Sequence, residues 1–171
     1  MPTSSTTRAK TQNGALPARG GDAVEILIAD HEVIKKLLDQ LVDATTPARR
    51  KSTLEQLKGV LTIHNATEEN LVYPALAVIA HRKMQSHHLY HETADADVLV
   101  FKIDQALQSA EDADFQKLAF EFRDAVLEHI EDEENSAFPK LQEHAEPAEM
   151  KSLTKNVRDF RGKIHVDGAK L

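Results

Sequence analysis

The sequence contains no cysteine and no tryptophan, and it has only six glycines and six prolines in 171 residues. Without cysteine there can be no disulfide, thiolate nucleophile or Fe–S cluster, so a metal could be bound only by histidine, carboxylates and tyrosine. The scarcity of turn-forming and aromatic residues argues against a many-stranded β fold. No apolar run approaches the ~20 residues that span a bilayer, and the first twenty residues hold no apolar secretory core. We therefore expect a cytoplasmic protein with no membrane partner.

Positive charge is also in short supply. Lys and Arg total 21 against 28 Asp plus Glu, which gives a net charge of −7. Such a surface repels a phosphate backbone, so nucleic acid is not an expected partner. The 41% hydrophobic and 29% charged residues are ordinary values for a globular chain.

The chain divides by composition into three parts. Residues 1–21 are rich in Ser, Thr, Gly and Ala and are expected to form a disordered N-terminal tail. Residues 22–142 hold the helical patterns described next. Residues 143–171 are expected to form a C-terminal helix and tail.

Four segments place apolar residues at alternating steps of three and four, the spacing of one helical face. The expected helices cover roughly residues 22–44, 46–73, 83–109 and 113–138, with Tyr73-Pro74 and Phe138-Pro139 ending the second and the fourth. Short connections favour antiparallel neighbours. The pattern therefore predicts an all-α fold, an antiparallel up-down four-helix bundle.

A shorter fifth helix, about 147–161, is expected to begin at Pro147. Its apolar side carries Met150, Leu153, Val157 and Phe160. A helix of this length needs a partner surface. We favour packing on its own bundle in a monomer, with a homodimer through this helix as the alternative.

An internal repeat marks the ends of the second and fourth helices. The pattern H-x-x-x-E-E-N-x-x-[Y/F]-P-x-L begins at His64 and again at His129, and each copy follows a helix with a His-Glu pair, at His31 and at His91. The bundle is thus expected to be built from two duplicated αα-hairpins. Tyr73 and Phe138 should plug one end of it, and the sequence leaves open whether Tyr73 also approaches a metal.

Histidine and glutamate interrupt the apolar faces of all four helices. Buried and unpaired, each such group would cost roughly 1–3 kcal/mol, so a metal is the economical explanation, with a protein-only polar core as the alternative. Carboxylates can bridge two metals while imidazoles bind at the ends. Glu69 and Glu134 should support these ligands or lie at the surface. The candidate metal ligands are His31, His64, Glu68, His87, His91, His129 and Glu133.

The register of the third helix needs a choice, because His88 and Glu92 also stand four residues apart. The face of His87 and His91 continues with Met84, Ala94, Val98 and Phe101, whereas the other face continues with Asp95, Leu99, Lys102 and Ala106. Since a core stripe should be mostly apolar, we favour His87 and His91 as the inward pair.

The order H…HxxxE…HxxxH…HxxxE resembles the hemerythrin-like HHE cation-binding family, in its bacterial type. The resemblance implies a di-iron centre, two Fe ions bridged by carboxylates and an oxo or hydroxo group, that binds O2 or a related ligand. By motif position, one iron would be held by His87, His91 and His129 and the other by His31 and His64, with Glu68 and Glu133 between them. Oxygen-carrying hemerythrins look like HxxxxD in the last motif, whereas this chain has His129-x-x-x-Glu133, which argues against simple O2 storage.

Three functions follow from this resemblance. The first is binding of O2, NO or a related diatomic ligand for sensing, delivery or stress response. The second is a redox enzyme that acts on peroxide, O2 or nitrogen oxides, and the sequence leaves the choice between these two open. Iron homeostasis is a weaker alternative, because ferritin-like sites use Glu-x-x-His pairs.

Overall fold

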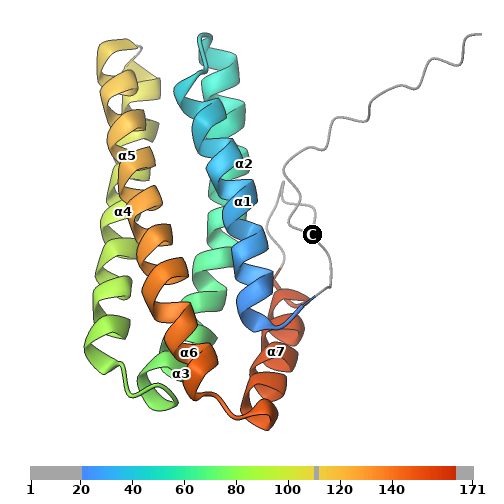
Figure 1. Cartoon of the computed structure of the whole chain (residues 1–171). Coiled ribbons are helices and arrows are strands. Elements are labelled where there is room, and N and C mark those ends of the chain that lie inside the picture. The colour runs from blue at the N-terminus through green and yellow to red at the C-terminus, as the bar shows by residue number, and fades with distance from the viewer. Residues whose placement is uncertain (1–20, 110–111, 165–171) are drawn as a thin grey trace, which may run out of the picture.

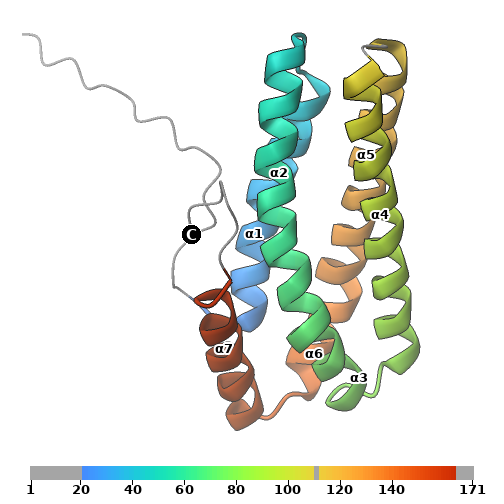
Figure 2. The same cartoon turned by 180° about the vertical axis from the view of Figure 1, so that it is seen from behind.

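The computed structural model describes residues 21–109 and 112–164, and every regular element within these ranges is a helix. The long helices are α1 (Ala23–Val42), α2 (Pro47–Thr67), α4 (Lys83–Ser109) and α5 (Asp112–Asp132), which stand side by side in Figures 1 and 2. Helix α1 packs on α2 and α5, and α4 packs on α5 and α2. The expected antiparallel four-helix bundle is confirmed. The expected N-terminal tail lies outside the described residues, apart from Gly21.

Local sequence explains where the first two helices begin. The Asp22 side chain accepts a hydrogen bond from the backbone N–H of Glu25, whose own side chain accepts one from the N–H of Asp22. This reciprocal pair satisfies two N–H groups that a helix start leaves without partners. Thr46 caps α2 in a similar way, and Pro47 takes the first helical position. In the described part of the chain, no helix is both long and apolar enough to cross a membrane.

The expectation that the two aromatic-proline pairs end their helices is wrong. A π-helical turn, η1 (Glu68–Val72), carries the chain from α2 into α3 (Tyr73–Val78), and η2 (Glu133–Ala137) carries it from α5 into α6 (Phe138–His144). A proline ring clashes with the carbonyl four residues earlier in an α-helix. In the wider π-helical turns, the backbone N–H of Tyr73 donates to the carbonyl of Glu68, and that of Phe138 donates to the carbonyl of Glu133, five residues earlier. This wider spacing avoids the clash. Both turns begin at the first glutamate of the repeat.

The fifth expected helix is α7 (Pro147–Arg161), and it packs on its own bundle against α1, α2 and η1. Its Leu153 and Val157 are buried in a lower apolar cluster, together with Tyr73 and Phe138. A second cluster fills the upper half of the bundle, around Phe115 and Phe122 of α5. Between the two clusters lies a layer of buried histidine and glutamate.

Helix α4 buries a different face from the one expected. Met84, Val98 and Phe101 are 82%, 52% and 64% exposed, and His87 and His91 are exposed as well. The sequence carries two apolar stripes on this helix. The stripe that faces inward contains no histidine, so its burial removes no imidazole from water, and its apolar spacing continues to the end of the helix. The outer stripe ends at Phe101, because the next two positions of its spacing are Gln105 and Gln108. The inward stripe consists of Ser86, Leu89, Thr93, Ala96, Val100, Ile103 and Leu107.

Candidate metal centre

Four buried side chains converge between the two apolar clusters. They are His31 of α1, His64 of α2, Glu68 of η1 and Glu133 of η2, and one ligand atom of each lies within 4.8 Å of the others. His64 Nε2 is 3.2 Å from Glu68 Oε1, and His31 Nε2 is 3.2 Å from Glu133 Oε2. His31 Nε2 is also 4.0 Å from Glu68 Oε1, so both carboxylates face the same pair of imidazoles.

Two further groups close the other side of this cluster. His129 Nε2 lies 3.6 Å from Glu133 Oε1. The hydroxyl of Tyr73 lies 3.2 Å from Glu68 Oε2, 2.9 Å from Glu133 Oε1 and 3.1 Å from His129 Nε2. Tyr73 therefore does more than plug the end of the bundle, because its hydroxyl contacts both carboxylates and an imidazole. Phe138, at the equivalent place in the second repeat, stacks on the ring of His31.

Each of the three imidazoles is held from behind by a carboxylate. The Nδ1 atom of His31 lies 2.8 Å from Glu134, that of His64 lies 3.4 Å from Asp30, and that of His129 lies 2.9 Å from Glu92. An ionised carboxylate can only accept a hydrogen bond, so Nδ1 carries the proton in each case. A neutral imidazole then presents the lone pair of Nε2 to the cluster, which is the arrangement that a metal requires.

The carboxylates behind the imidazoles are themselves paired with basic groups. Arg161 of α7 donates from both terminal nitrogens to the buried Asp30. Lys35 lies 3.0 Å from Glu134, and His88 lies 3.1 Å from Glu92. Because each carboxylate is fixed by its own partner, the ring orientations are set before any ligand binds.

Burial strongly perturbs the ionisable groups of the cluster. Burial and the negative charge of Glu133 raise the pKa of Glu68 well above its ordinary value. Burial would also raise the pKa of Glu133, but a hydrogen bond from His31 and the positive charge that His129, His31 and His64 carry when protonated lower it overall. Burial and the two carboxylates raise the pKa of Tyr73 well above that of a free phenol, so its hydroxyl stays protonated at neutral pH.

The cluster fits a cation better than a protein-only network. His31 Nε2, Glu68 Oε1 and Glu133 Oε2 are buried and have no hydrogen-bond partner among the described residues. Buried polar atoms without partners are rare because each costs roughly 1–3 kcal/mol. Imidazole nitrogens and carboxylate oxygens are ligands of iron and related transition metals.

Comparison with known proteins agrees with this chemistry. The sequence matches the family described as hemerythrin HHE cation-binding domain over residues 22–141. The chain belongs to this family. An HHE domain-containing protein, the Rv2633c homolog from Mycobacterium kansasii, has a crystal structure that is similar with a TM-score of 0.68 and 24% identity, covering 84% of this chain and 89% of that one. A DNA nickase from Nostoc sp. (strain PCC 7120 / SAG 25.82 / UTEX 2576) is 21% identical over 140 residues, which are 82% of this chain and 39% of the nickase.

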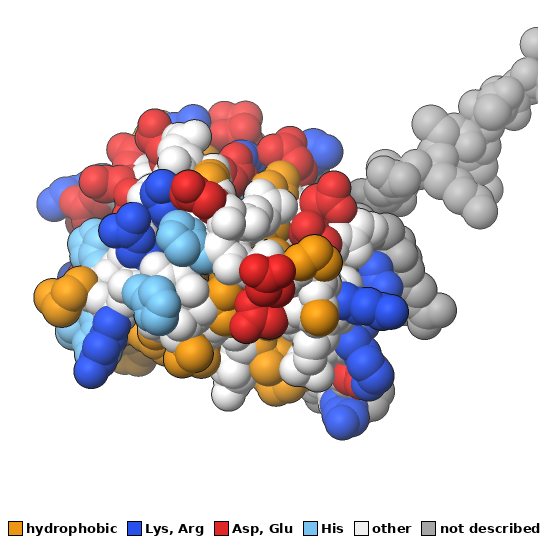
Figure 3. All heavy atoms as spheres, turned by 60° about the horizontal axis from the view of Figure 1, so that its bottom comes forward, with side chains coloured by type: hydrophobic (Ala, Val, Ile, Leu, Met, Phe, Trp, Pro, Cys, Tyr) orange, Lys and Arg blue, Asp and Glu red, His pale blue; other side chains and the backbone are white. Residues whose placement is uncertain are grey.

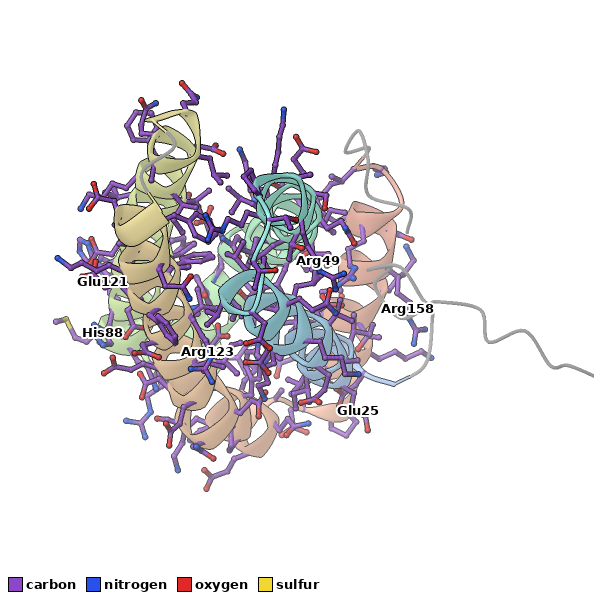
Figure 4. All side chains as sticks on the ribbon, turned by 90° about the horizontal axis from the view of Figure 1, so that it is seen from above. Glu25, Arg49, His88, Glu121, Arg123 and Arg158 are labelled. Carbon is purple, nitrogen blue, oxygen red and sulfur yellow. The ribbon has the colours of Figure 1, made fainter. Side chains whose placement is uncertain are left out.

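This HHE domain brings together five of the seven residues expected from its sequence: His31, His64, Glu68, His129 and Glu133. The expectation that His87 and His91 face inward is wrong, because both lie on the exposed side of α4. The alternative pair, His88 and Glu92, does not lie on one side of α4. Glu92 reaches inward to His129, while His88 lies on the outer side of the bundle (Figure 4).

Thr93 takes the place on α4 that His31 takes on α1, which the spacing of the histidines does not predict. Asp30 and Glu92 hold the histidines of the following helices, and the next residues, His31 and Thr93, are both buried. The Tyr73 hydroxyl lies beside Thr93 and contacts His129 Nε2. The two copies of the repeat already differ at this point in the sequence. Tyr73 of the first copy corresponds to Phe138 of the second, so only the first copy carries a hydroxyl.

A cavity of about 20 Å³ lies beside His64 and His129. Most of its other lining is apolar, with Ile34, Phe122 and Val126 among the residues. A space of ~10–15 Å³ is enough for one water-sized molecule. The cavity therefore matches a very small ligand.

Proposed function

We propose that this HHE domain binds two iron ions at the buried cluster and takes up a small diatomic ligand beside them, O2 or NO. The observation that carries the proposal is the set of three buried ligand atoms without hydrogen-bond partners, His31 Nε2, Glu68 Oε1 and Glu133 Oε2. His31 and His64 would hold one iron, and His129 the other. Glu68 and Glu133 stand between these two sides, where each can offer one oxygen to each ion.

Iron in such a site supplies a redox-active position that binds O2 and related molecules. The chain contributes the surroundings of that ligand. The small cavity beside His64 and His129 excludes larger molecules, and its apolar walls of Ile34, Phe122 and Val126 suit an uncharged diatomic ligand. The proposed roles are sensing, delivery or stress response.

A redox enzyme acting on peroxide, O2 or nitrogen oxides is the second candidate, and Tyr73 favours it. The hydroxyl of Tyr73 is buried, protonated and 2.9 Å from Glu133 Oε1, so it can donate a hydrogen bond within the cluster. Iron homeostasis is less favoured, because the cluster contains no Glu-x-x-His pair of the ferritin-like kind.

The remaining expectations on partners and location stay proposals. The net charge of −7 supports the absence of a nucleic-acid partner, and the chain covers only 39% of the relative described as a nickase. The cytoplasmic location stays a prediction from the sequence.

The test begins with metal analysis of protein produced with ample iron. We expect two irons per chain, and one zinc with no iron would overturn the proposal. The loaded protein is then reduced without air and mixed rapidly with O2, NO or H2O2. A spectrum that forms with O2 or NO and reverses under vacuum supports ligand binding, whereas loss of peroxide over many turnovers supports the enzyme.

A further inference from the structure

Helix α4 carries an apolar stripe on its outer surface that no described part of the chain covers. Met84, Val98 and Phe101 are 82%, 52% and 64% exposed. His87, His91 and Ala94 lie between them in sequence and are exposed too. Figure 3 shows exposed histidines gathered with hydrophobic side chains along one edge of the molecule. Exposed apolar side chains that gather along one face of a helix in this way mark an interaction site.

The spacing of the stripe is that of a coiled-coil seam. Its six members, from Met84 to Phe101, alternate steps of three and four, as positions a and d of a heptad do. In the same heptads, position f is filled by Leu89, Ala96 and Ile103, which pack toward the core of the bundle. The seam therefore points directly away from the bundle and extends for ~26 Å at 1.5 Å per residue.

We propose that two copies of this chain dimerise by packing these α4 stripes in antiparallel orientation. Antiparallel pairing places position a of one helix against position d of the other. Met84 then faces Phe101 of the second copy, His87 faces Val98, and His91 faces Ala94, so no histidine meets another histidine. One patch matches itself under a two-fold axis, as a closed dimer requires.

The charges beside the seam match the same arrangement. In the antiparallel register, Lys83 comes opposite Asp104 of the second copy, a carboxylate that Lys58 of the same copy also binds. A parallel pairing would instead place each histidine of the seam against the same histidine of the second copy. The antiparallel dimer is therefore the one that the layers of the seam favour. It replaces the expectation of a monomer, and it does not depend on the proposed metal chemistry.

Sedimentation of the full-length protein over a wide range of concentration tests the dimer. We expect wild type to shift from monomer to dimer as concentration rises. Phe101→Glu should remain monomeric, since it places a charge in the seam while leaving the folded monomer intact. The matched control is Val78→Glu, because Val78 of α3 is 72% exposed and lies off the stripe. A wild type that stays monomeric throughout, or a Phe101→Glu variant that still dimerises, would overturn the proposal.

The absence of cysteine permits a test of orientation. Single variants Met84→Cys and Phe101→Cys are oxidised alone and as a mixture. The antiparallel register predicts a disulfide-linked dimer in the mixture and little in either variant alone, because the ends of the seam are ~26 Å apart. Links formed by each variant with itself, and none in the mixture, would reject this register.

Discussion

At the scale of the residue, the buried histidines of the cluster should bind metal, whereas the exposed histidines of α4 should not. We expect His64→Ala to lose most of its bound iron, because its Nε2 atom points at Glu68 from a ring held by Asp30. His87→Ala should keep the iron content of wild type, since His87 is exposed on α4. The measurement is metal content per chain after identical purification. Equal losses in the two variants would mean that α4 turns its other face inward.

Glu68 is the residue at which metal binding and stability oppose each other. Its pKa is raised in the folded protein, so the metal-free folded chain keeps a proton that the unfolded chain releases. The contribution of Glu68 to the free energy of unfolding therefore falls as pH rises above the ordinary carboxyl range. Glu68→Gln should stabilise the metal-free protein at neutral pH by on the order of 1 kcal/mol while lowering its affinity for iron.

Urea unfolding of both metal-free proteins at several pH values checks this prediction. The stability difference between Glu68→Gln and wild type should shrink as pH falls toward the ordinary carboxyl pKa of 4.5. A difference that stays constant with pH would show that Glu68 is not protonated in the folded chain.

Val126 tests the role of the small cavity. Val126→Phe should fill the space beside His64 and His129, and so slow the binding of O2 or NO at least about tenfold without removing iron. The larger ring will cost roughly 1–3 kcal/mol of stability. Val126→Ala enlarges the same space and should have the opposite effect on the rate. Rapid mixing of each reduced protein with the ligand gives the rates, and identical values in all three proteins would remove the cavity from the mechanism.

At the scale of the element, α7 is connected to the metal centre through one buried ion pair. Arg161 holds Asp30, and Asp30 holds Nδ1 of His64. The paired cations and hydrogen bonds lower the pKa of Asp30 despite its burial. Arg161→Met leaves that buried carboxylate with the hydrogen bond from His64 but without the guanidinium charge, which should cost about 3–5 kcal/mol and weaken iron binding roughly 10- to 100-fold.

The control for this prediction lies on the same helix. Arg158 is exposed and donates to the carbonyl of Gly21, so Arg158→Met should change stability and iron affinity little. The double variant Asp30→Asn with Arg161→Met should recover part of the lost stability, because the uncompensated charge is gone. Urea midpoints and iron competition with a chelator measure the two effects. No recovery in the double variant would assign the loss to packing of α7 instead.

The elements were largely predictable because their signals are local. The face of α1 that contains His31 and Ile34 is buried as expected, and α7 has the predicted limits. Helix α4 was not predictable in the same way. Two stripes of similar apolar character run along it, and the presence of His87 and His91 on one of them pointed to the wrong face. Only packing against α2, α3 and α5 selects the other.

In the metal centre, too, the residues with a local signal were predictable and those that depend on distant contacts were not. The repeat located His64, Glu68, His129 and Glu133, because a spacing of four residues puts both members of each pair on one face of a helix. The roles of Asp30, Glu92 and Arg161 depend on contacts between residues far apart in the chain. The π-helical turns are also invisible to an α-helical period, although they follow from the prolines.

At the scale of the whole molecule, the centre joins two apolar cores through α1, α2 and α5, so the stability of the bundle should depend on the metal. Without a cation, the ligand atoms of His31, Glu68 and Glu133 stay buried and unpaired. A ligand that binds the folded state alone adds ~2.7 kcal/mol when its concentration is a hundred times its Kd. For a chain of this size that corresponds to a rise in Tm of roughly 5–10 °C.

Thermal unfolding of the metal-free and iron-loaded proteins measures this rise. The variant Glu68→Gln separates metal coordination from other effects of iron. It should be stable without metal, yet its Tm should rise little when iron is added. His87→Ala should gain as much as wild type, since its substitution lies on the exposed face of α4. If wild type and Glu68→Gln gained equally, iron would be acting elsewhere on the chain. If neither gained, the buried cluster would be held by its own hydrogen bonds, the protein-only core that the sequence left as the alternative.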